Sequence, residues 1–286
     1  MRRRLLDYLA CASFSAFLAG EPAWAQSPDA EEAGYTPTVG QVGKDVVWVP
    51  TPQDLVDVML DMAELKPGDK LVDLGAGDGR TVISAAKRGI TARGIEYNPD
   101  LVTLAQRAAK QEGVTDRASF EQADIFESDF SEVTVVTLFL LPRLNMRLRP
   151  TLLEMPPGTR IISNSFTMED WTPDETRKVN ENCTGRCIAY KWVVPAKVAG
   201  TWDLDGKELV LAQTFQHLEG ELRDGERATP LSEARMDGKK VAFNMNGQRY
   251  EGEVDGDEMR GKVDGKQAWR AKRVSPTDST ADAGPK

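Results

Sequence analysis

Hydrophobic and polar positions follow two different patterns along this chain of 286 residues. Between residues 46 and 195, short apolar runs alternate with stretches in which apolar side chains recur at helical spacing. Beyond Pro195, the apolar residues fall into short alternating runs separated by turn-forming residue pairs. The first pattern predicts an α/β region over residues 46–197, and the second predicts a small all-β region over residues 198–274.

The α/β region predicts a parallel sheet that is covered on both faces. An extended segment at 46–49 leads into a helix that begins at Thr51-Pro52 and stops before Pro67-Gly68. Two late strands flank the cysteines of the stretch NCTGRC, which predicts an antiparallel hairpin. Strands are expected over residues 70–74, 91–95, 118–122, 133–140, 159–163, 176–181 and 188–194, and helices over residues 80–88, 99–112 and 143–154.

The all-β region carries six Asx-Gly pairs, which are the strongest local signal for tight β-hairpins. They begin at Asp205, Asp224, Asp237, Asn246, Asp255 and Asp264. The region is therefore predicted to be a β-meander, either a small barrel or a curved sheet. We expect its large aromatic side chains to fill the interior rather than to form a ligand cage. These are Trp202, Phe215, Phe243 and Trp269.

The two ends of the chain predict segments outside the folded core. Residues 1–25 combine a basic start, a short apolar stretch and the sequence Ala23-Trp24-Ala25, as in a cleaved export signal. This predicts a periplasmic or secreted protein, and an uncleaved membrane-associated anchor is the alternative. Residues 26–45 are expected to form a flexible leader, and residues 275–286 a disordered tail.

Charge and cysteine content narrow the range of partners. The formal net charge is −9. Without the predicted signal at residues 1–25, which holds three Arg, one Asp and one Glu, the charge is −10, and the remaining chain has no run of Lys or Arg, so no nucleic-acid partner is expected. Cys183 and Cys187 could form a metal half-site, a redox pair or a disulfide. Because His217 is the only histidine, a Cys/His zinc site is disfavoured, and no metal is predicted. In an oxidising compartment a disulfide is favoured, with free thiols as the alternative.

The stretch LVDLGAGDGR, at residues 71–80, lies between the first strand and the next helix of the predicted sheet. Glycines at that position let the backbone approach a ligand at the carboxyl edge of the sheet, although a tight turn without a ligand is the alternative. The spacing is Gly-x-Gly-x-Gly, and Asp78 stands near the helix start, so a dinucleotide pyrophosphate is disfavoured. A nucleoside without phosphate and with a zwitterionic tail fits better.

Two further acidic residues follow the next two strands. Glu96, in GIEYNP, can accept hydrogen bonds from ribose hydroxyls, and Asp124, in EQADIF, can accept one from an adenine amino group. Either residue alone could be a cap or a turn residue. Because the carboxyl ends of parallel strands share one edge of the sheet, we expect both acids to line the same crevice.

These motifs resemble the class I S-adenosylmethionine-dependent methyltransferases over residues 46 to about 195. The resemblance implies a Rossmann-like sheet of seven strands that ends in an antiparallel hairpin. It also implies S-adenosyl-L-methionine as the cofactor, with Phe126 or Ile125 against the adenine ring, although packing in the core is the favoured role for Ile125. Gly75, Gly77 and Gly79 would line its methionine portion, with Asp73 at the amino group, Glu96 at the ribose and Asp124 at the adenine N6.

A narrower resemblance concerns the methyl acceptor. VPTP and the stretch from FLLP at 139–142 to IIS are similar to lysine methyltransferases that modify membrane-embedded proteins such as the c-ring of ATP synthase, and to bacterial relatives of unassigned substrate. This implies N-methylation of a protein lysine or another amine. Leu140, Leu141 and Pro142 would form an apolar rim for a lysine stem, or simply end a buried strand. FLLP also replaces the polar motif of enzymes that methylate nucleobase or glutamine nitrogens.

The resemblance does not identify a catalytic residue. SNSFTMEDW, at residues 163–171, is expected to form the opposite wall of the site. A histidine base is not expected, because His217 lies far downstream. Since an export signal conflicts with the supply of cofactor, the alternative function is a non-catalytic exported module that binds a nucleoside and a partner. An aminopropyltransferase would need more acidic residues around the amine. The acceptor and the oligomeric state stay unassigned.

Overall fold

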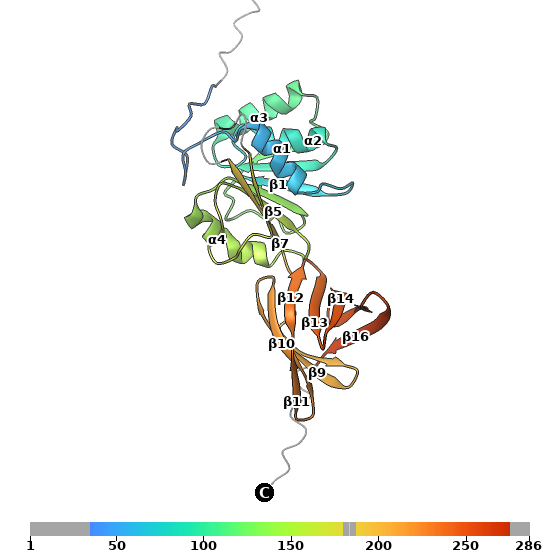
Figure 1. Cartoon of the computed structure of the whole chain (residues 1–286). Helices are drawn as coiled ribbons and strands as arrows, with labels where there is room; N and C mark the ends of the chain where they lie inside the picture. Colours follow the sequence, from blue (N-terminus) through green and yellow to red (C-terminus); the bar gives the residue numbers. More distant parts are fainter. Residues whose placement is uncertain (1–34, 180–182, 184–186, 275–286) are drawn as a thin grey trace, which may run out of the picture. The chain divides into compact units, whose positions relative to one another are not determined.

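Two β-sheets and four helices make up the part of the chain that the computed structural model describes, which is residues 35–179, 183 and 187–274 (Figure 1). The predicted signal, the first part of the leader and the predicted tail lie outside these residues. Within the described ranges, no helix is both long and apolar enough to cross a membrane.

The first sheet has seven strands in the order β3-β2-β1-β4-β5-β7-β6. All neighbours are parallel except for β7, which runs antiparallel to both β5 and β6. This confirms the predicted Rossmann-like sheet and its final hairpin. The strands are β1 (Lys70–Leu74), β2 (Thr91–Glu96), β3 (Ala118–Gln122), β4 (Val135–Leu138), β5 (Arg160–Asn164), β6 (Glu175–Lys178) and β7 (Ile188–Val193).

Four helices cover the two faces of this sheet. Apolar residues of α1, α2 and α3 pack into one core cluster, and those of α4 pack into the other. Because successive strand residues point to opposite faces, Val135 of β4 belongs to the first cluster and Val136 to the second. The helices are α1 (Gln53–Met62), α2 (Arg80–Lys87), α3 (Pro99–Gln111) and α4 (Pro142–Leu153).

Strand β4 is shorter than the predicted strand at 133–140. Its four residues are all buried, as expected for a central parallel strand. The apolar run continues beyond the strand for a different reason, because Phe139 and Leu140 leave the sheet and line a cavity at its carboxyl edge. A continuous apolar run therefore covered both a strand and the loop that follows it.

The second sheet is a closed antiparallel barrel. Eight strands pair in the order β10-β12-β13-β14-β15-β16-β8-β9, and β9 pairs back to β10, while β11 extends the sheet from β10. Closure leaves these eight strands without an open edge. The strands are β8 (Gly200–Leu204), β9 (Lys207–Thr214), β10 (His217–Asp224), β11 (Arg227–Pro230), β12 (Ser232–Asp237), β13 (Lys240–Met245), β14 (Gln248–Asp255), β15 (Glu258–Val263) and β16 (Gln267–Arg273).

All six Asx-Gly pairs lie where consecutive strands of the second sheet connect, as predicted, although Asp224, Asp237 and Asp255 are the last residues of their strands. At one of them Met245 pairs with Gln248, so Asn246 and Gly247 form a two-residue loop with φ values of 51° and 75°. Such loops need positive φ at both central residues, which Asn and Gly tolerate best. The predicted domain limit between residues 197 and 198 stays a prediction; β7 ends at Val193 and β8 begins at Gly200.

The barrel interior is filled by side chains, including Trp202, Phe243 and Trp269, which are all buried. The prediction was wrong for Phe215. This residue occupies the turn between β9 and β10, where φ is 53°, and its ring stacks on that of Trp171, which lies between β5 and β6, with ring centroids 5.7 Å apart. Side chains of a strand point alternately into and out of a barrel, but a residue in a turn does not follow this alternation. The Phe215 side chain therefore points out of the barrel.

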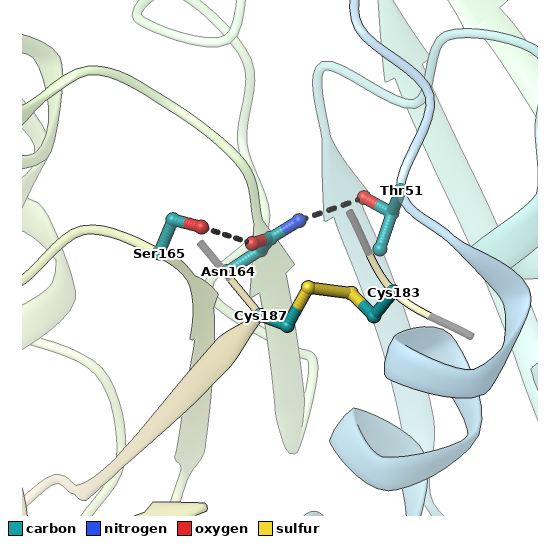
Figure 2. Close-up of a disulfide and its surroundings, with 5 residues drawn as sticks. All are labelled: Thr51, Asn164, Ser165, Cys183 and Cys187. Carbon is teal, nitrogen blue, oxygen red and sulfur yellow. Dashed lines mark hydrogen bonds between the residues drawn. A yellow bond between two sulfur atoms is a disulfide. The ribbon is translucent and has the colours of Figure 1, made fainter. Parts of the chain in front are cut away.

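Cys183 and Cys187 form a disulfide, as the sequence favoured (Figure 2). Cys187 directly precedes β7, and Cys183 lies four positions earlier in the chain. By the loop-entropy estimate, so short a closed loop adds about 2 kcal/mol to the free energy of unfolding.

Candidate functional site

A cavity of about 270 Å³ lies at the carboxyl ends of β1, β2, β3 and β4. This edge is where open α/β sheets bind their ligands. Five segments supply most of its lining: the glycine-rich loop after β1, the acidic loops after β2 and β3, the loop after β4, and residues 41–51, which precede α1. Five of the six predicted ligand residues line this cavity. They are Asp73, Gly75, Gly77, Glu96 and Asp124.

The glycines of the loop have left-handed backbones, with φ of 82° at Gly75, 55° at Gly77 and 82° at Gly79. Side chains are strained in that region, so the loop conformation itself favours glycine. Gly75 and Gly77 line the cavity, and the backbone N–H groups of Gly75 and Ala76 donate to the Ile95 carbonyl at 2.9 and 3.0 Å. The loop is therefore held against the end of β2.

Gly79 does not line the cavity, contrary to its predicted place beside the ligand. A Cβ there would lie 2.7 Å from the Phe120 ring and 2.8 Å from Ala105. The absence of a side chain at Gly79 lets the start of α2 pack closely against α3 and β3. The sequence pattern alone could not separate this packing role from ligand contact.

Asp73 is buried at the end of β1, where its Oδ1 accepts a hydrogen bond from Thr137 at 2.7 Å. Burial raises the pKa of the Asp73 carboxyl to about 7, and the neighbouring carboxylates of Glu96 and Asp78 add to this effect. Hydrogen bonds from Thr137 and Thr81 act in the opposite direction. A buried carboxyl that lines a cavity and resists ionisation is suited to a cationic ligand group.

Glu96 is fixed at the end of β2 by two backbone donors. Its Oε2 accepts from the Gly77 N–H and its Oε1 from the Asn98 N–H, both at 2.9 Å. A carboxylate has about four acceptor positions, so two remain for hydroxyl groups of a ligand. The same side chain thus holds the glycine-rich loop and faces the cavity.

Asp124 follows β3, and its Oδ1 accepts from the Phe126 N–H at 3.0 Å. Its Oδ2 is paired with the Nζ of Lys44, which holds the pKa of Asp124 below its usual range. Of the two candidates for the adenine ring, Ile125 lines the cavity, whereas the Phe126 ring is covered by the Arg147 guanidinium at 3.6 Å.

Residues 40–48 form a small hairpin, here called the leader hairpin. Gly40 N–H donates to the Trp48 carbonyl, and Trp48 N–H to the Gln41 carbonyl, both at 2.9 Å, and Val42 pairs with Val47. The sequence had predicted a flexible leader up to residue 45 and an extended segment at 46–49. Nothing in its Pro- and Gly-rich composition indicated that these residues pair with each other and line the cavity.

The wall beyond β4 and β5 is apolar, and Phe166 from the stretch at 163–171, which was predicted to form the opposite wall, belongs to it. Phe139 and Phe166 stack with ring centroids 6.1 Å apart, and both line the cavity together with Leu140, Leu141 and Leu144. Leu141 is 39% exposed, while Leu140 is buried. Pro142, expected in the rim, begins α4 instead and does not line the cavity.

Asn164 and Ser165, from the predicted opposite wall, are buried behind the cavity and do not line it. Asn164 Nδ2 donates to Thr51 Oγ1 at 3.1 Å, and Ser165 Oγ donates to Asn164 Oδ1 at 2.7 Å, as Figure 2 shows. Thr51 does line the cavity. This network therefore supports the wall rather than reaching a ligand directly.

The apolar wall carries no titratable side chain. The cavity's acidic residues come from the leader hairpin and the loops after β1, β2 and β3. His217 lies in the barrel, 3.2 Å from Thr172 Oγ1, and does not line the cavity. Among the described residues, no group of three or more His, Cys, Asp or Glu side chains could hold a metal ion.

Comparisons with known proteins give a consistent result for this half of the chain. The family model of the ANTKMT methyltransferase domain matches residues 73–175. The protein-lysine N-methyltransferase of Saccharolobus islandicus strain REY15A is 43% identical over 152 residues, which is 52% of this chain and 94% of that protein. The human lysine N-methyltransferase of the ATP synthase c-subunit is 35% identical over 150 residues, covering 52% of this chain and 61% of that protein.

A solved structure also matches this half. The RNA methyltransferase from Salinibacter ruber, in complex with S-adenosyl-L-homocysteine, has 46% sequence identity and a TM-score of 0.49. The match covers 52% of this chain and 96% of that one. These matches cover about half of the chain.

Proposed function

Because the chain belongs to the class I S-adenosylmethionine-dependent methyltransferases, we propose that it methylates the side-chain nitrogen of a lysine in a protein. The observation that carries this proposal is the 43% identity with a protein-lysine N-methyltransferase across 94% of that protein's length. The apolar wall formed by Phe139, Leu141 and Phe166 supports it, since an aliphatic lysine stem can pack there. The alternative of a non-catalytic exported module finds no support among the relatives.

The enzyme's cofactor is S-adenosyl-L-methionine, and the cavity fits it. Asp73 is a buried carboxyl whose pKa is raised, and a ligand ammonium group would stabilise its ionised form. Gly75 and Gly77 line the same cavity. In our proposal, Asp73 holds the amino group of the cofactor, Glu96 the ribose hydroxyls and Asp124 the adenine amino group. The bound cofactor supplies an electrophilic methyl group on a sulfonium.

The chain's own contribution to the reaction is to orient the acceptor and to keep water out. The acceptor amine must be neutral before it can attack, and a lysine in water has a pKa of about 10.4. No carboxylate or imidazole lies on the apolar wall among the described residues, so the proton leaves to solvent. Burial against Phe139 and Phe166 disfavours the ammonium form and thus assists its loss.

Glu96→Ala is expected to weaken binding of S-adenosyl-L-homocysteine about tenfold. The substitution removes two acceptor positions for ribose hydroxyls and also releases the Gly77 N–H, and a hydrogen bond to a charged group contributes about 1.5–3 kcal/mol. Calorimetric titration measures the effect. Glu112→Ala is the matched control, because Glu112 forms an ion pair with Lys87 at the surface and does not line the cavity. An unchanged affinity in Glu96→Ala would refute the ribose assignment.

Leu141→Glu is expected to raise the KM for a protein acceptor about tenfold and to leave S-adenosyl-L-homocysteine affinity unchanged. The half-exposed Leu141 lies where the stem of the acceptor must enter, and a carboxylate there would be desolvated on acceptor binding. Val39→Glu, an exposed position outside the cavity lining, is the control. A loss of cofactor affinity in Leu141→Glu would place this residue in the cofactor site instead.

The test of the proposed function follows the methyl group. Residues 26–286 are incubated with S-adenosyl-L-methionine tritiated in its methyl group, together with either a protein extract or total RNA from the organism that encodes the chain. Acid hydrolysis of the labelled protein should release tritiated Nε-methylated lysine, and Glu96→Ala should lower the yield at limiting cofactor. Label in RNA, or in other amino acids only, would overturn the lysine proposal.

A further inference from the structure

The leader hairpin places a lysine side chain inside the cofactor cavity. Lys44 lines the cavity, and its Nζ forms an ion pair with Asp124 Oδ2. The same ammonium lies 4.6 Å from the centroid of the Tyr97 ring. Lys44 comes from a segment 80 positions before Asp124, so only the tertiary fold brings the two together.

This inference rests on the proposed function, in which Asp124 accepts a hydrogen bond from the adenine amino group, because the ion pair occupies the same carboxylate. An ammonium group and an exocyclic amino group are both hydrogen-bond donors, and they compete for the same carboxylate. Each oxygen of Asp124 already has one donor, since Oδ1 accepts from the Phe126 N–H at 3.0 Å and Oδ2 is paired with Lys44. An adenine amino group that approached Oδ2 from the cavity would therefore have to share it with Lys44 or displace Lys44.

Further contacts hold the hairpin over the cavity. Arg143 Nη2, at the start of α4, donates to the Asp45 carbonyl at 2.6 Å. The Trp48 indole covers the bare face of Gly77, where an added Cβ would lie 2.7 Å from its Nε1. The hairpin thus contacts the glycine-rich loop, the adenine-side acid and the helix that follows β4.

We propose that Lys44 is an intramolecular competitor for Asp124, so that the leader hairpin must release Asp124 before the adenine base binds. The Lys44 side chain is 36% exposed and that of Asp124 13%. Ion pairs this accessible to water are weak, which makes the contact readily reversible. The carboxylate therefore stays paired in the absence of cofactor and becomes available when cofactor arrives.

Lys44→Met tests the proposal, because Met retains an unbranched stem and lacks the ammonium. The variant is expected to bind S-adenosyl-L-homocysteine about three- to fivefold more tightly by calorimetric titration, a range that corresponds to loss of one weak ion pair. In stopped-flow mixing, its association rate should also rise, since the protein no longer starts with Asp124 paired to residue 44. Lys87→Met, which breaks a surface ion pair with Glu112, should leave both values unchanged.

Two further measurements separate competition from a general charge effect. Raising the NaCl concentration should strengthen wild-type binding, because salt screens the exposed Lys44–Asp124 pair, and should have little effect on Lys44→Met. Asp124→Asn should weaken binding less when it is introduced into the wild type than when it is introduced into Lys44→Met. In the wild type the substitution loses the contact with adenine but also ends the competition from Lys44, which offsets part of the loss. Additive effects would contradict the proposed competition.

An unchanged or weaker affinity in Lys44→Met would overturn the proposal and show that Lys44 is neutral or supports the bound cofactor. Because the probe is S-adenosyl-L-homocysteine and not a methyl acceptor, this outcome is independent of whether the acceptor is a protein lysine.

Discussion

Asp73→Asn is expected to weaken S-adenosyl-L-homocysteine binding about a hundredfold and, at pH 8 without ligand, to raise the free energy of unfolding. Both effects have the same cause. The buried carboxylate is unfavourable in the folded protein until a cationic group of the ligand offsets its charge. The neutral amide removes the unfavourable charge together with the attraction for the ligand's ammonium.

The sign of the pH dependence follows from the raised pKa. Between pH 3.8 and about 7, the folded protein binds more protons at Asp73 than the unfolded chain does. The contribution of this group to the free energy of unfolding therefore falls as pH rises through that window, by about 4 kcal/mol at most, and is constant above it. Denaturant unfolding at pH 5 and pH 8 should show this fall in the wild type relative to Asp73→Asn. Equal pH dependence in both proteins would contradict the assignment.

Ligand binding should show the opposite trend. Because the ligand's ammonium favours ionised Asp73, affinity for S-adenosyl-L-homocysteine is expected to rise as pH increases through about 7. 5′-Methylthioadenosine lacks the amino-acid tail and is the matched control. Its affinity should be independent of pH over the same range and should be nearly the same in the wild type and in Asp73→Asn. A similar loss for both ligands would indicate a disturbed cavity instead of a lost charge contact.

Gly79→Ala is expected to lower the free energy of unfolding by about 3 kcal/mol or more. Two costs combine: an alanine in the left-handed region costs about 1–2 kcal/mol, and crowding in a packed core costs about 1–3 kcal/mol. The crowding is specific to this position, since a Cβ would lie 2.7 Å from the Phe120 ring and 2.8 Å from Ala105. Chemical denaturation without ligand measures the loss.

Gly89→Ala is the matched control for Gly79→Ala. Gly89 has φ of 85° against 82° at Gly79, but a Cβ there meets nothing within 4 Å. It should therefore show only the backbone cost, about 1–2 kcal/mol. If both variants lost the same stability, crowding against Phe120 and Ala105 would not matter, and Gly79 would be fixed by backbone conformation alone.

Local features were predicted well because their determinants lie within a few residues. The strands at Lys70–Leu74 and Ala118–Gln122 match their predicted bounds, and all six Asx-Gly pairs form turns. An apolar run or a pair of residues that tolerates positive φ carries its own conformational preference. The convergence of Asp73, Glu96 and Asp124 on one cavity also followed, because parallel strands place their carboxyl ends at one edge.

Other features depended on partners far away in the sequence. Gly79 and Gly77 belong to one motif, yet Phe120 and Ala105 pack against the first and Trp48 against the second. Phe215 is a large aromatic residue of the kind expected in a core, but it lies in the two-residue turn between β9 and β10, which has no Asx-Gly pair to mark it. There its ring stacks on that of Trp171.

The sequence by itself determined the elements, the turn positions and the set of acids at the sheet edge, since each rests on backbone preference or strand direction. Only the tertiary structure decided how the barrel closes through pairing of β8 with β16, and which side chain pairs with Asp124 at the cavity. Those contacts join residues that are about 70 to 80 positions apart in the chain. Which residues pair depends on packing and charge in the folded protein, and a local sequence pattern does not predict it.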